Sequence, residues 1–409
     1  MQNKKAGSVL GGTLLIAGSC IGAGMLALPV ITGPGGFGPS MILFLFSWLF
    51  MTITGFLLME ANLTLGYQLS LVSLAEKTLG GFGKFLTWFL FLFLFYSLSV
   101  AYIAASGSIL QTIVFDLFGL YWAPWIGSLI FTLIFGSVLL SGVVQVDYLN
   151  RLLMLGLVIT YVVLIFLGSQ HVDFDYLMRS HWKYAFAALP ILVISFGFHN
   201  MIPSLAMYLQ GDVKRLRLTL LFGSLIPLVI YFLWQYVMLG IIPADQILPG
   251  LDQGEAATTI LRVVVGRSWI NTVAQGFALF AIITSFLAQS LSLVDFLADG
   301  LKLSKKGYSR LLLVFLTLIP PFLLAYVYPN IFLHALNLAG GISAVILFGV
   351  MPVLMVWQLR YRQKTAMSPL LPAGRFLLVI VFVVALGIFF LELAQELGLS
   401  LLPKEMEII

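Results

Sequence analysis

Eleven long apolar stretches decide what this chain can fold into. Each is near or above the roughly 20 residues that an α-helix needs to cross a bilayer. Hydrophobic residues make up 61% of the 409, and charged residues make up 9%, against about 25% charged residues in an average soluble domain. We therefore predict an all-α polytopic membrane protein with eleven transmembrane helices. The predicted spans are 8–31, 38–65, 85–113, 122–141, 149–168, 184–209, 216–242, 271–298, 308–328, 330–358 and 373–397.

The first stretch has some features of a signal peptide, because Lys4 and Lys5 precede it. However, it stays apolar as far as Ile31, which is longer than the apolar region of a signal peptide. We therefore expect a retained first span. A single cysteine, Cys20, excludes an intrachain disulfide and a cysteine metal cluster.

The Lys and Arg residues indicate the orientation of the spans. If the amino terminus is cytoplasmic, the cytoplasmic side receives all but five of the 21 basic residues, as expected for loops that remain inside. The five on the other side are Arg179, Lys183, Arg262, Arg267 and Lys404. We predict a cytoplasmic amino terminus and a periplasmic carboxyl terminus. The net charge of +5 is too diffuse to indicate nucleic acid binding.

The spacing of the spans indicates an internal repeat. Spans six to ten start between 176 and 186 residues after spans one to five. Because five is odd, the second block enters the membrane in the opposite orientation, which makes the repeat an inverted one. We expect residues 1–168 and 184–358 to form the two five-helix repeats, and 373–397 to be an additional transmembrane helix.

Three glycines within seven residues interrupt the first span at its centre. Each Gly costs about 1 kcal/mol relative to Ala inside a helix, so we predict a broken helix 1. In lipid, an opened backbone must line a cavity or be buried in protein. We expect the amides from Ile21 to Gly24 to bind a carboxylate, and nearby carbonyls to bind an ammonium group. The candidate substrate-binding residues are Gly18, Ser19, Cys20, Ile21, Gly22, Ala23 and Gly24.

The inverted repeat requires a second interruption in span six, and the sequence contains one. Gly197 loosens the helix, and Pro203 has no N–H group and suits the first turn of a restarting helix. We therefore predict a broken helix 6 beside broken helix 1. Its candidate substrate-binding residues are Ser195, Phe196, Gly197, Phe198, His199 and Asn200.

Three segments resemble the tyrosine and tryptophan permeases, which are aromatic amino acid permeases of the amino acid–polyamine–organocation superfamily. The segments are 18–29, 195–200 and 284–299, and they occur in the order found in that family. The resemblance covers essentially the whole chain. It implies the leucine-transporter-type fold, a five-plus-five inverted repeat, and proton-coupled uptake of an aromatic amino acid across a bacterial inner membrane. It does not imply which aromatic amino acid is carried.

Ionisable and hydroxyl groups inside the spans are candidates for ion coupling. Glu60 is either a proton carrier or a carboxylate that pairs locally. His199, beside the second break, either titrates or caps freed backbone groups. Thr284 and Ser285 lie where sodium-dependent proteins of the leucine-transporter type place a hydroxyl pair. They either hold an ion or bond to neighbouring helices.

An aromatic substrate also requires an apolar pocket with a polar group at the ring end. Tyr96 is the candidate that we assign to substrate binding on span three. Further candidates are Ser99, Tyr102 and Asn337, in addition to Phe196 and Phe198. At the inner end of span eight, we expect Asp295 and Asp299 to pair with Lys302, or with the loop residues Asp147 and Arg151.

The sequence contains no nucleotide-binding loop, metal-ligand cluster or hydrolytic triad, so we expect neither an enzyme nor a cofactor or bound metal. The expected function is import of an aromatic amino acid, tyrosine first and tryptophan second, by proton symport. Sodium-coupled uptake of a neutral amino acid is the alternative. A membrane substrate sensor or a channel is the alternative from another class. The expected partners are the substrate and the lipid bilayer, and the sequence does not indicate an oligomeric state.

Overall fold

The structure, a computed structural model, describes residues 7–265, 269–365, 369–371 and 374–399, and all regular elements in these residues are helices. Arg267 and Lys404 lie outside the described residues. Ten helices are long and apolar enough to cross a membrane, and the bent pair at the start of the described chain brings the total to eleven. The prediction of an all-α protein with eleven spans is therefore confirmed. The boundaries of the seven unbroken spans among them are α3 (Phe37–Leu65), α5 (Pro124–Ser141), α6 (Val143–Gly168), α11 (Val213–Ile241), α14 (Trp269–Gly300), α15 (Gly307–Val327) and α18 (Arg375–Glu396).

Span one is broken where the glycines predicted a break. It consists of α1 (Val9–Cys20), η1 (Ala23–Leu26), α2 (Leu28–Thr32) and η2 (Gly33–Gly35). The two parts are bent by 46°. Ile21 and Gly22 between them have extended backbone.

Span six is also broken, as predicted from span one. It consists of α8 (Trp182–Ala185), η4 (Phe186–Ala188), α9 (Leu189–Ser195), η5 (His199–Met201) and α10 (Ile202–Tyr208). Helix α10 begins with Ile202 followed by Pro203, the position at which proline's missing N–H costs nothing.

Span three is longer than predicted. Helix α4 runs from Leu71 to Phe118 and contains one non-helical residue, Gly80, with φ of 75°. The charged residues Glu76, Lys77 and Lys84 obscured its first turns in the sequence. Because glycine adopts positive φ without strain, the chain can turn at Gly80 and continue as a helix into the membrane.

Span ten changes its helical form along its length. It consists of α16 (Phe332–Leu338), η6 (Ala339–Val350), α17 (Met351–Trp357) and η7 (Gln358–Gln363). Segments η6 and η7 are π-helices, a rare form that is frequently found at functional sites.

Short helices join the spans. They are η3 (Ser169–His171), α7 (Phe174–Leu177), α12 (Ala244–Asp252) and α13 (Ala257–Val265). Helices α12 and α13 occupy the longest connection and pack on each other, with α12 also against α2 and α13 against α14.

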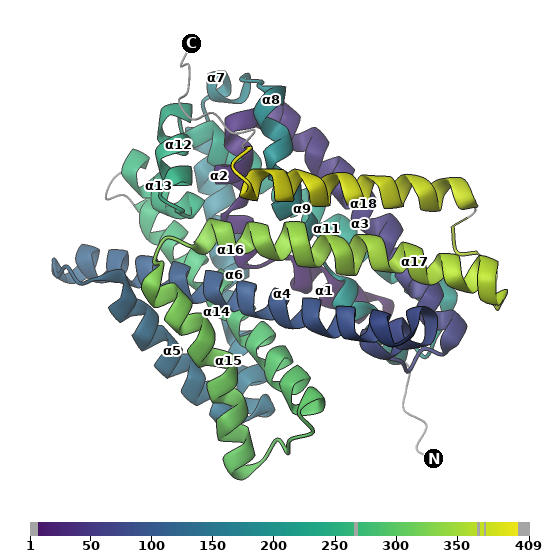
Figure 1. The fold of residues 1–409 in the computed structure, drawn as a ribbon. Coiled ribbons are helices and arrows are strands. Elements are labelled where there is room, and N and C mark those ends of the chain that lie inside the picture. The colour runs from purple at the N-terminus through teal and green to yellow at the C-terminus, as the bar shows by residue number, and fades with distance from the viewer. Residues whose placement is uncertain (1–6, 266–268, 366–368, 372–373, 400–409) are drawn as a thin grey trace.

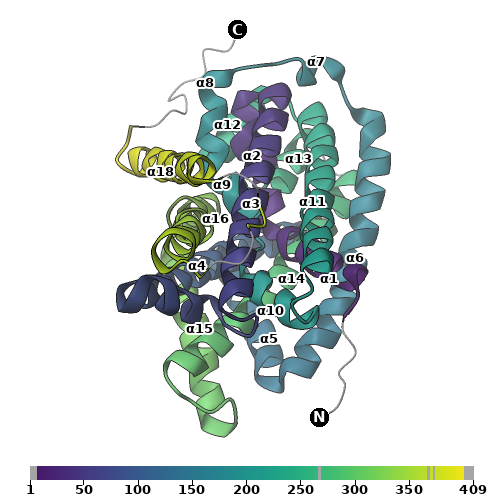
Figure 2. The same cartoon turned by 90° about the vertical axis from the view of Figure 1, so that its right-hand side faces the viewer.

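The helices surround the two broken spans. Helix α18, span ten and α4 lie in successive layers on one side (Figure 1). Helices α3, α11 and α6 cover other sides, with α1 packed between α11 and the interior (Figure 2). Helices α5 and α15 pack against each other and against α4. The five-plus-five division of the chain stays a prediction.

Candidate functional site

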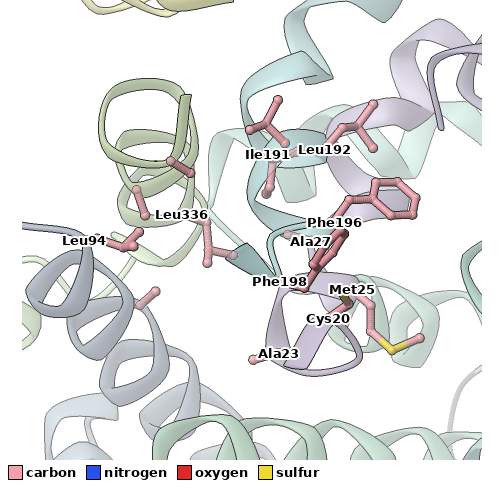
Figure 3. Packing of buried hydrophobic residues seen from close by; sticks show 14 of the residues in the cluster. Cys20, Ala23, Met25, Ala27, Leu94, Ile191, Leu192, Phe196, Phe198 and Leu336 are labelled. Carbon is pink, nitrogen blue, oxygen red and sulfur yellow. The ribbon is translucent and has the colours of Figure 1, made fainter. Parts of the chain in front are cut away.

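The two helix breaks lie side by side in the interior. Figure 3 shows Cys20, Ala23 and Met25 of span one next to Phe196 and Phe198 of span six. The site is therefore built from interrupted backbone of two segments that are far apart in sequence, and its walls come from other spans.

Tyr231 on α11 links the two breaks. Its hydroxyl oxygen lies 2.6 Å from the carbonyl oxygen of Cys20, where α1 ends, and 2.9 Å from the carbonyl oxygen of Ser195, where α9 ends. The one hydroxyl hydrogen is therefore shared between two carbonyls that lack helical partners. On the next turn, the indole of Trp234 donates to the carbonyl of Met25 at 2.8 Å. Helix α11 thus holds both breaks in place.

Some of the amides at the first break already donate hydrogen bonds to protein groups, so fewer amides are available for a substrate carboxylate than the sequence predicted. The amide of Ile21 donates to the carbonyl of Ala17 at 3.0 Å. The amide of Ala23 donates to the hydroxyl oxygen of Ser285 at 2.9 Å. Within the described residues, no hydrogen bond uses the amides of Gly22 and Gly24. Two of the four amides that the sequence indicated therefore remain able to bind a carboxylate.

Several carbonyls at the breaks are also without backbone donors. In the described part of the chain, no backbone amide donates to the carbonyls of Gly18, Ser19 or Gly197. Carbonyl oxygens at the end of a half-helix carry partial negative charge. The two breaks together can therefore bind both charged groups of a zwitterion.

A cavity of about 390 Å³ lies against the two breaks, within the range of about 300–1,000 Å³ that is usual for small-molecule sites. Its wall includes Leu14, Asn150 and Ser292 in addition to the breaks, so it extends toward the end of the bundle where α1 begins and α14 ends. Several lining residues on this side, such as Ser19 and Ser292, are exposed. The cavity is therefore accessible from that end.

Most of the predicted backbone-site residues line this cavity. The lining set contains the predicted residues Gly18, Ser19, Cys20, Ile21, Gly22, Ala23, Gly24, Ser195, Gly197, Asn200, Thr284 and Ser285. The structure thus brings together three stretches that the sequence indicated separately. Four of the other predicted residues, Tyr96, Phe196, Phe198 and His199, are not in the cavity wall.

Tyr96 does not line the cavity. Its hydroxyl donates to the carbonyl of Leu316 on α15 at 2.8 Å, so the side chain ties two helices together. Tyr102 lines the cavity instead. Residues six apart on α4 point in different directions, so the two tyrosines do not share a face of the helix.

Phe196, Phe198 and His199 support the second break from behind. Both phenylalanines are 1% exposed and His199 is fully buried. The imidazole stacks on Phe348 with ring centroids 4.8 Å apart, and its Nε2 lies 3.0 Å from the hydroxyl of Thr54. Its Nδ1 has no partner among the described residues. His199 is thus one residue layer away from the cavity, which Phe348 lines.

Glu60 lies outside the cavity wall, in a buried ion pair with Arg360 on η7. Glu60 is 1% exposed. Its two carboxylate oxygens accept from Nε and Nη2 of Arg360 at 2.6 Å each, and the amide of Leu370 donates to one of them at 2.8 Å. Of the two interpretations from the sequence, this geometry favours local pairing.

The hydroxyl pair on α14 is engaged by protein groups. Thr284 donates to the carbonyl of Phe280 on its own helix at 2.8 Å, and Ser285 accepts from the amide of Ala23. The hydroxyl of Ser285 thus satisfies an amide that the break leaves without a helical partner.

The ion pairs at the C-terminal end of α14 differ from the predicted ones. Asp295 pairs with Lys305 at 2.6 Å rather than with Lys302, and Arg151 pairs with Asp147 within α6 at 2.9 Å. Both pairs are largely exposed, as expected for residues at helix ends, and they do not contribute to the cavity.

The aromatic wall of the cavity was not found in the sequence. Phe91, Leu94, Phe95 and Leu98 of α4 line it together with Phe348 of η6. The wall also contains Gln289, which the sequence pattern did not indicate, whereas the predicted Asn337 does not line the cavity. The signal was available, because 91, 94, 95, 98 and 102 follow the spacing of one helix face. With 34 phenylalanines in the chain, however, many faces show the same pattern.

Comparison with known proteins identifies what this chain is similar to. Residues 5–392 match the model of the tryptophan/tyrosine permease family. The tyrosine-specific transport system 1 of Haemophilus influenzae is 34% identical, over 97% of this chain and 98% of that protein. The tryptophan-specific transport protein of Pseudomonas aeruginosa is 32% identical, over 93% of each chain. The low affinity tryptophan permease of Escherichia coli is 30% identical, over 88% of this chain and 89% of that protein.

Proposed function

The chain belongs to the tryptophan/tyrosine permease family, and from this premise we propose that it imports an aromatic amino acid across a bacterial inner membrane by proton symport. Tyrosine is the first expected substrate and tryptophan the second, because the similar proteins carry these two specificities in their names. The observation that carries the proposal is the cavity at the two helix breaks.

The backbone of the breaks binds the part that all amino acids share. The amides of Gly22 and Gly24 bind the substrate carboxylate, since they lie at the start of the short helix η1 and no protein group accepts from them in the described residues. The carbonyls of Gly18, Ser19 and Gly197 bind the ammonium group. This arrangement needs no charged side chain.

The side chain of the substrate lies against α4 and η6. Phe91 and Phe348 have ring centroids 6.3 Å apart, and Phe91 and Phe95 have centroids 5.8 Å apart. Rings at these separations pack favourably edge to face or offset, and an aromatic substrate extends the cluster. An aliphatic amino acid makes fewer such contacts.

The accessible end of the cavity is the cytoplasmic end. The basic residues at this end of the bundle include Lys214, Arg215, Lys305 and Arg310, and an excess of Lys and Arg marks cytoplasmic loops. With the amino terminus inside, an opening at this end supports an inward-facing state. The two breaks occupy equivalent places in the five-plus-five inverted repeat, 1–168 and 184–358, that we propose for the chain.

His199 is the proposed proton carrier, supported by its complete burial beside the second break and by its unpartnered Nδ1. The pairing of Glu60 with Arg360 supports a structural role for Glu60. Sodium coupling is the second candidate, because Thr284 and Ser285 line the cavity. The hydroxyl groups of Thr284 and Ser285 already form hydrogen bonds with protein groups, which favours proton coupling over sodium coupling.

Uptake by purified protein in liposomes tests both substrate and ion. We expect labelled tyrosine and tryptophan to accumulate when the outside is made acidic, with equal accumulation in sodium and choline buffers. Accumulation in sodium buffer but not in choline buffer would show that sodium, not the proton, is the coupling ion. No uptake of any aromatic amino acid, together with clear uptake of another solute, would contradict the proposed substrate class.

A further inference from the structure

The carboxamide of Gln289 on α14 has surroundings that fix its orientation. The Nε2 atom donates to the carbonyl oxygen of Phe95 and lies 3.0 Å from the hydroxyl oxygen of Ser99. A backbone carbonyl only accepts hydrogen bonds, so the nitrogen, not the oxygen, must face Phe95. Both hydrogens of Nε2 thus have acceptors on α4.

The other end of the same group, Oε1, is a buried acceptor without a partner among the described residues. Gln289 as a whole residue is 9% exposed, and it lines the cavity. An unpaired buried acceptor costs about 1–3 kcal/mol, and only a hydrogen-bond donor recovers this free energy. The binding partner that fits Oε1 therefore carries an O–H or N–H group.

Gln289 lies at the end of the cavity formed by the aromatic wall, where the substrate ring would bind, and not at the end formed by the two helix breaks. Ser285, one helical turn earlier on the same face of α14, accepts from the amide of Ala23 at the first break. Gln289 is anchored on α4 beside Phe95, which belongs to the aromatic wall. One helix face thus contacts the break and, a turn later, the aromatic wall.

We propose that Oε1 of Gln289 is the acceptor of a ring-end subsite that takes an aromatic side chain with a donor, a phenol or an indole, and disfavours a plain phenyl ring. The inference rests on the proposed function, since it assumes that the cavity binds an aromatic amino acid. A phenol donates its O–H and an indole its N–H to Oε1. A phenyl ring leaves Oε1 unpaired, so a hydrogen-bonding site discriminates against it more strongly than an apolar pocket can.

Two other polar groups of the wall do not provide this selection. Asn150 Oδ1, near the start of α6, is also buried and unpaired. Unlike Gln289, the Asn150 amide is not fixed by any hydrogen bond within the described residues, so it can turn either atom toward a ligand. The hydroxyl of Tyr102 rotates and can donate as well as accept. Gln275 on the same helix α14 is the matched control, because its Oε1 is also buried and unpaired among the described residues but it does not line the cavity.

The test measures how well unlabelled amino acids inhibit counterflow of labelled tyrosine into liposomes. The competitors are tyrosine, phenylalanine, para-fluorophenylalanine, tryptophan, and tryptophan methylated on its indole nitrogen. Phenylalanine and para-fluorophenylalanine lack the O–H donor of tyrosine, and the methylated tryptophan lacks the indole N–H donor. For the wild type, we expect the half-inhibitory concentration of each analogue without a donor to be about ten times that of its parent amino acid, tyrosine or tryptophan. In Gln289→Met, the ratio of the half-inhibitory concentration of the analogue to that of its parent falls toward one. Phenylalanine inhibits this variant at least as well as it inhibits the wild type. In Gln275→Met, the ratios stay at the wild-type value.

The outcomes separate this inference from the proposed function. If no aromatic amino acid drives counterflow in the wild type, the proposed function fails. If aromatic amino acids exchange but the wild type does not distinguish donor from non-donor analogues, or Gln289→Met keeps the wild-type ratios, only the Gln289 subsite is overturned. If Gln289→Met does not insert, Ser99→Ala serves as the second variant. It removes one of the two anchors and must lower the ratios, whereas unchanged ratios overturn the subsite.

Discussion

The hydroxyl oxygen of Tyr231 lies 2.6 Å from the carbonyl oxygen of Cys20, at the residue where the first broken helix stops. The same hydroxyl reaches the carbonyl of Ser195, at the end of α9 in the second broken span. A buried side chain of an unbroken helix therefore sets the relative position of the two interruptions that form the site.

Tyr231→Phe is expected to weaken binding of the substrate about tenfold, because two buried carbonyls lose a shared donor and the breaks are no longer held together. Titration of purified protein with labelled tyrosine measures this change. Tyr161→Phe is the matched control, since its hydroxyl donates to the carbonyl of Ile230 on the same helix α11 at 2.8 Å, outside the cavity. Equal losses in the two variants would contradict a specific role for Tyr231.

Gly22→Ala is expected to weaken substrate binding about tenfold, because the Ser285 hydroxyl must rotate away from the new methyl group and lose its hydrogen bond with the Ala23 amide. A Cβ atom at Gly22 would lie 2.2 Å from the hydroxyl oxygen of Ser285, whereas one at Gly24 would lie 3.5 Å from its nearest neighbour, Ser195 Oγ. Gly22 has an extended backbone that any residue adopts, so strain is not the cause. Gly24→Ala should bind tyrosine nearly as well as the wild type.

A double variant separates the steric clash from other effects of the same substitution. In Gly22→Ala combined with Ser285→Ala, the clashing oxygen is gone and the remaining Cβ contact is an ordinary 3.5 Å. We expect the affinity of the double variant to match that of Ser285→Ala alone, a clear departure from additivity. Additive losses would show that Gly22 is needed for some reason other than space.

Arg360→Leu is expected to lower the free energy of unfolding by about 3–5 kcal/mol, since it leaves the buried carboxylate of Glu60 without its cation. The double variant Glu60→Leu with Arg360→Leu should recover most of this loss. Thermal unfolding in detergent measures both. Glu60→Gln should keep the wild-type pH dependence of tyrosine uptake, and a flat pH profile in that variant would restore Glu60 as a proton carrier.

Glu392→Leu is expected to leave thermal stability unchanged or to raise it. Glu392 on α18 is 1% exposed, and neither carboxylate oxygen has a partner among the described residues. A buried, unpaired carboxyl costs free energy that an apolar side chain does not. Glu396→Leu is the control, because Glu396 lies 3.5 Å from His334 and loses that contact. Marked destabilisation by Glu392→Leu alone would show that the buried carboxyl has a necessary partner.

Much of the fold was predictable because the bilayer restricts the choices. The apolar stretches located the eleven spans. A helix that crosses a bilayer must be about 20 residues long and must form its backbone hydrogen bonds within itself. The glycines from Gly18 to Gly24 and the pair Gly197 and Pro203 located both breaks, since glycine and proline disfavour the interior of a helix. Such signals are local, and they do not depend on the neighbouring helices.

The sequence by itself thus determined the spans, the two interruptions and the backbone that lines the cavity. Only the tertiary structure decided which side chains face it. Tyr96 and Tyr102 look alike in the sequence, but the packing of α4 against α15 directs only Tyr102 to the cavity. Gln289 became a candidate only when α4 supplied two acceptors for its nitrogen and left its oxygen unpaired. Hydrogen bonds between helices depend on three-dimensional neighbours, and no local pattern records them.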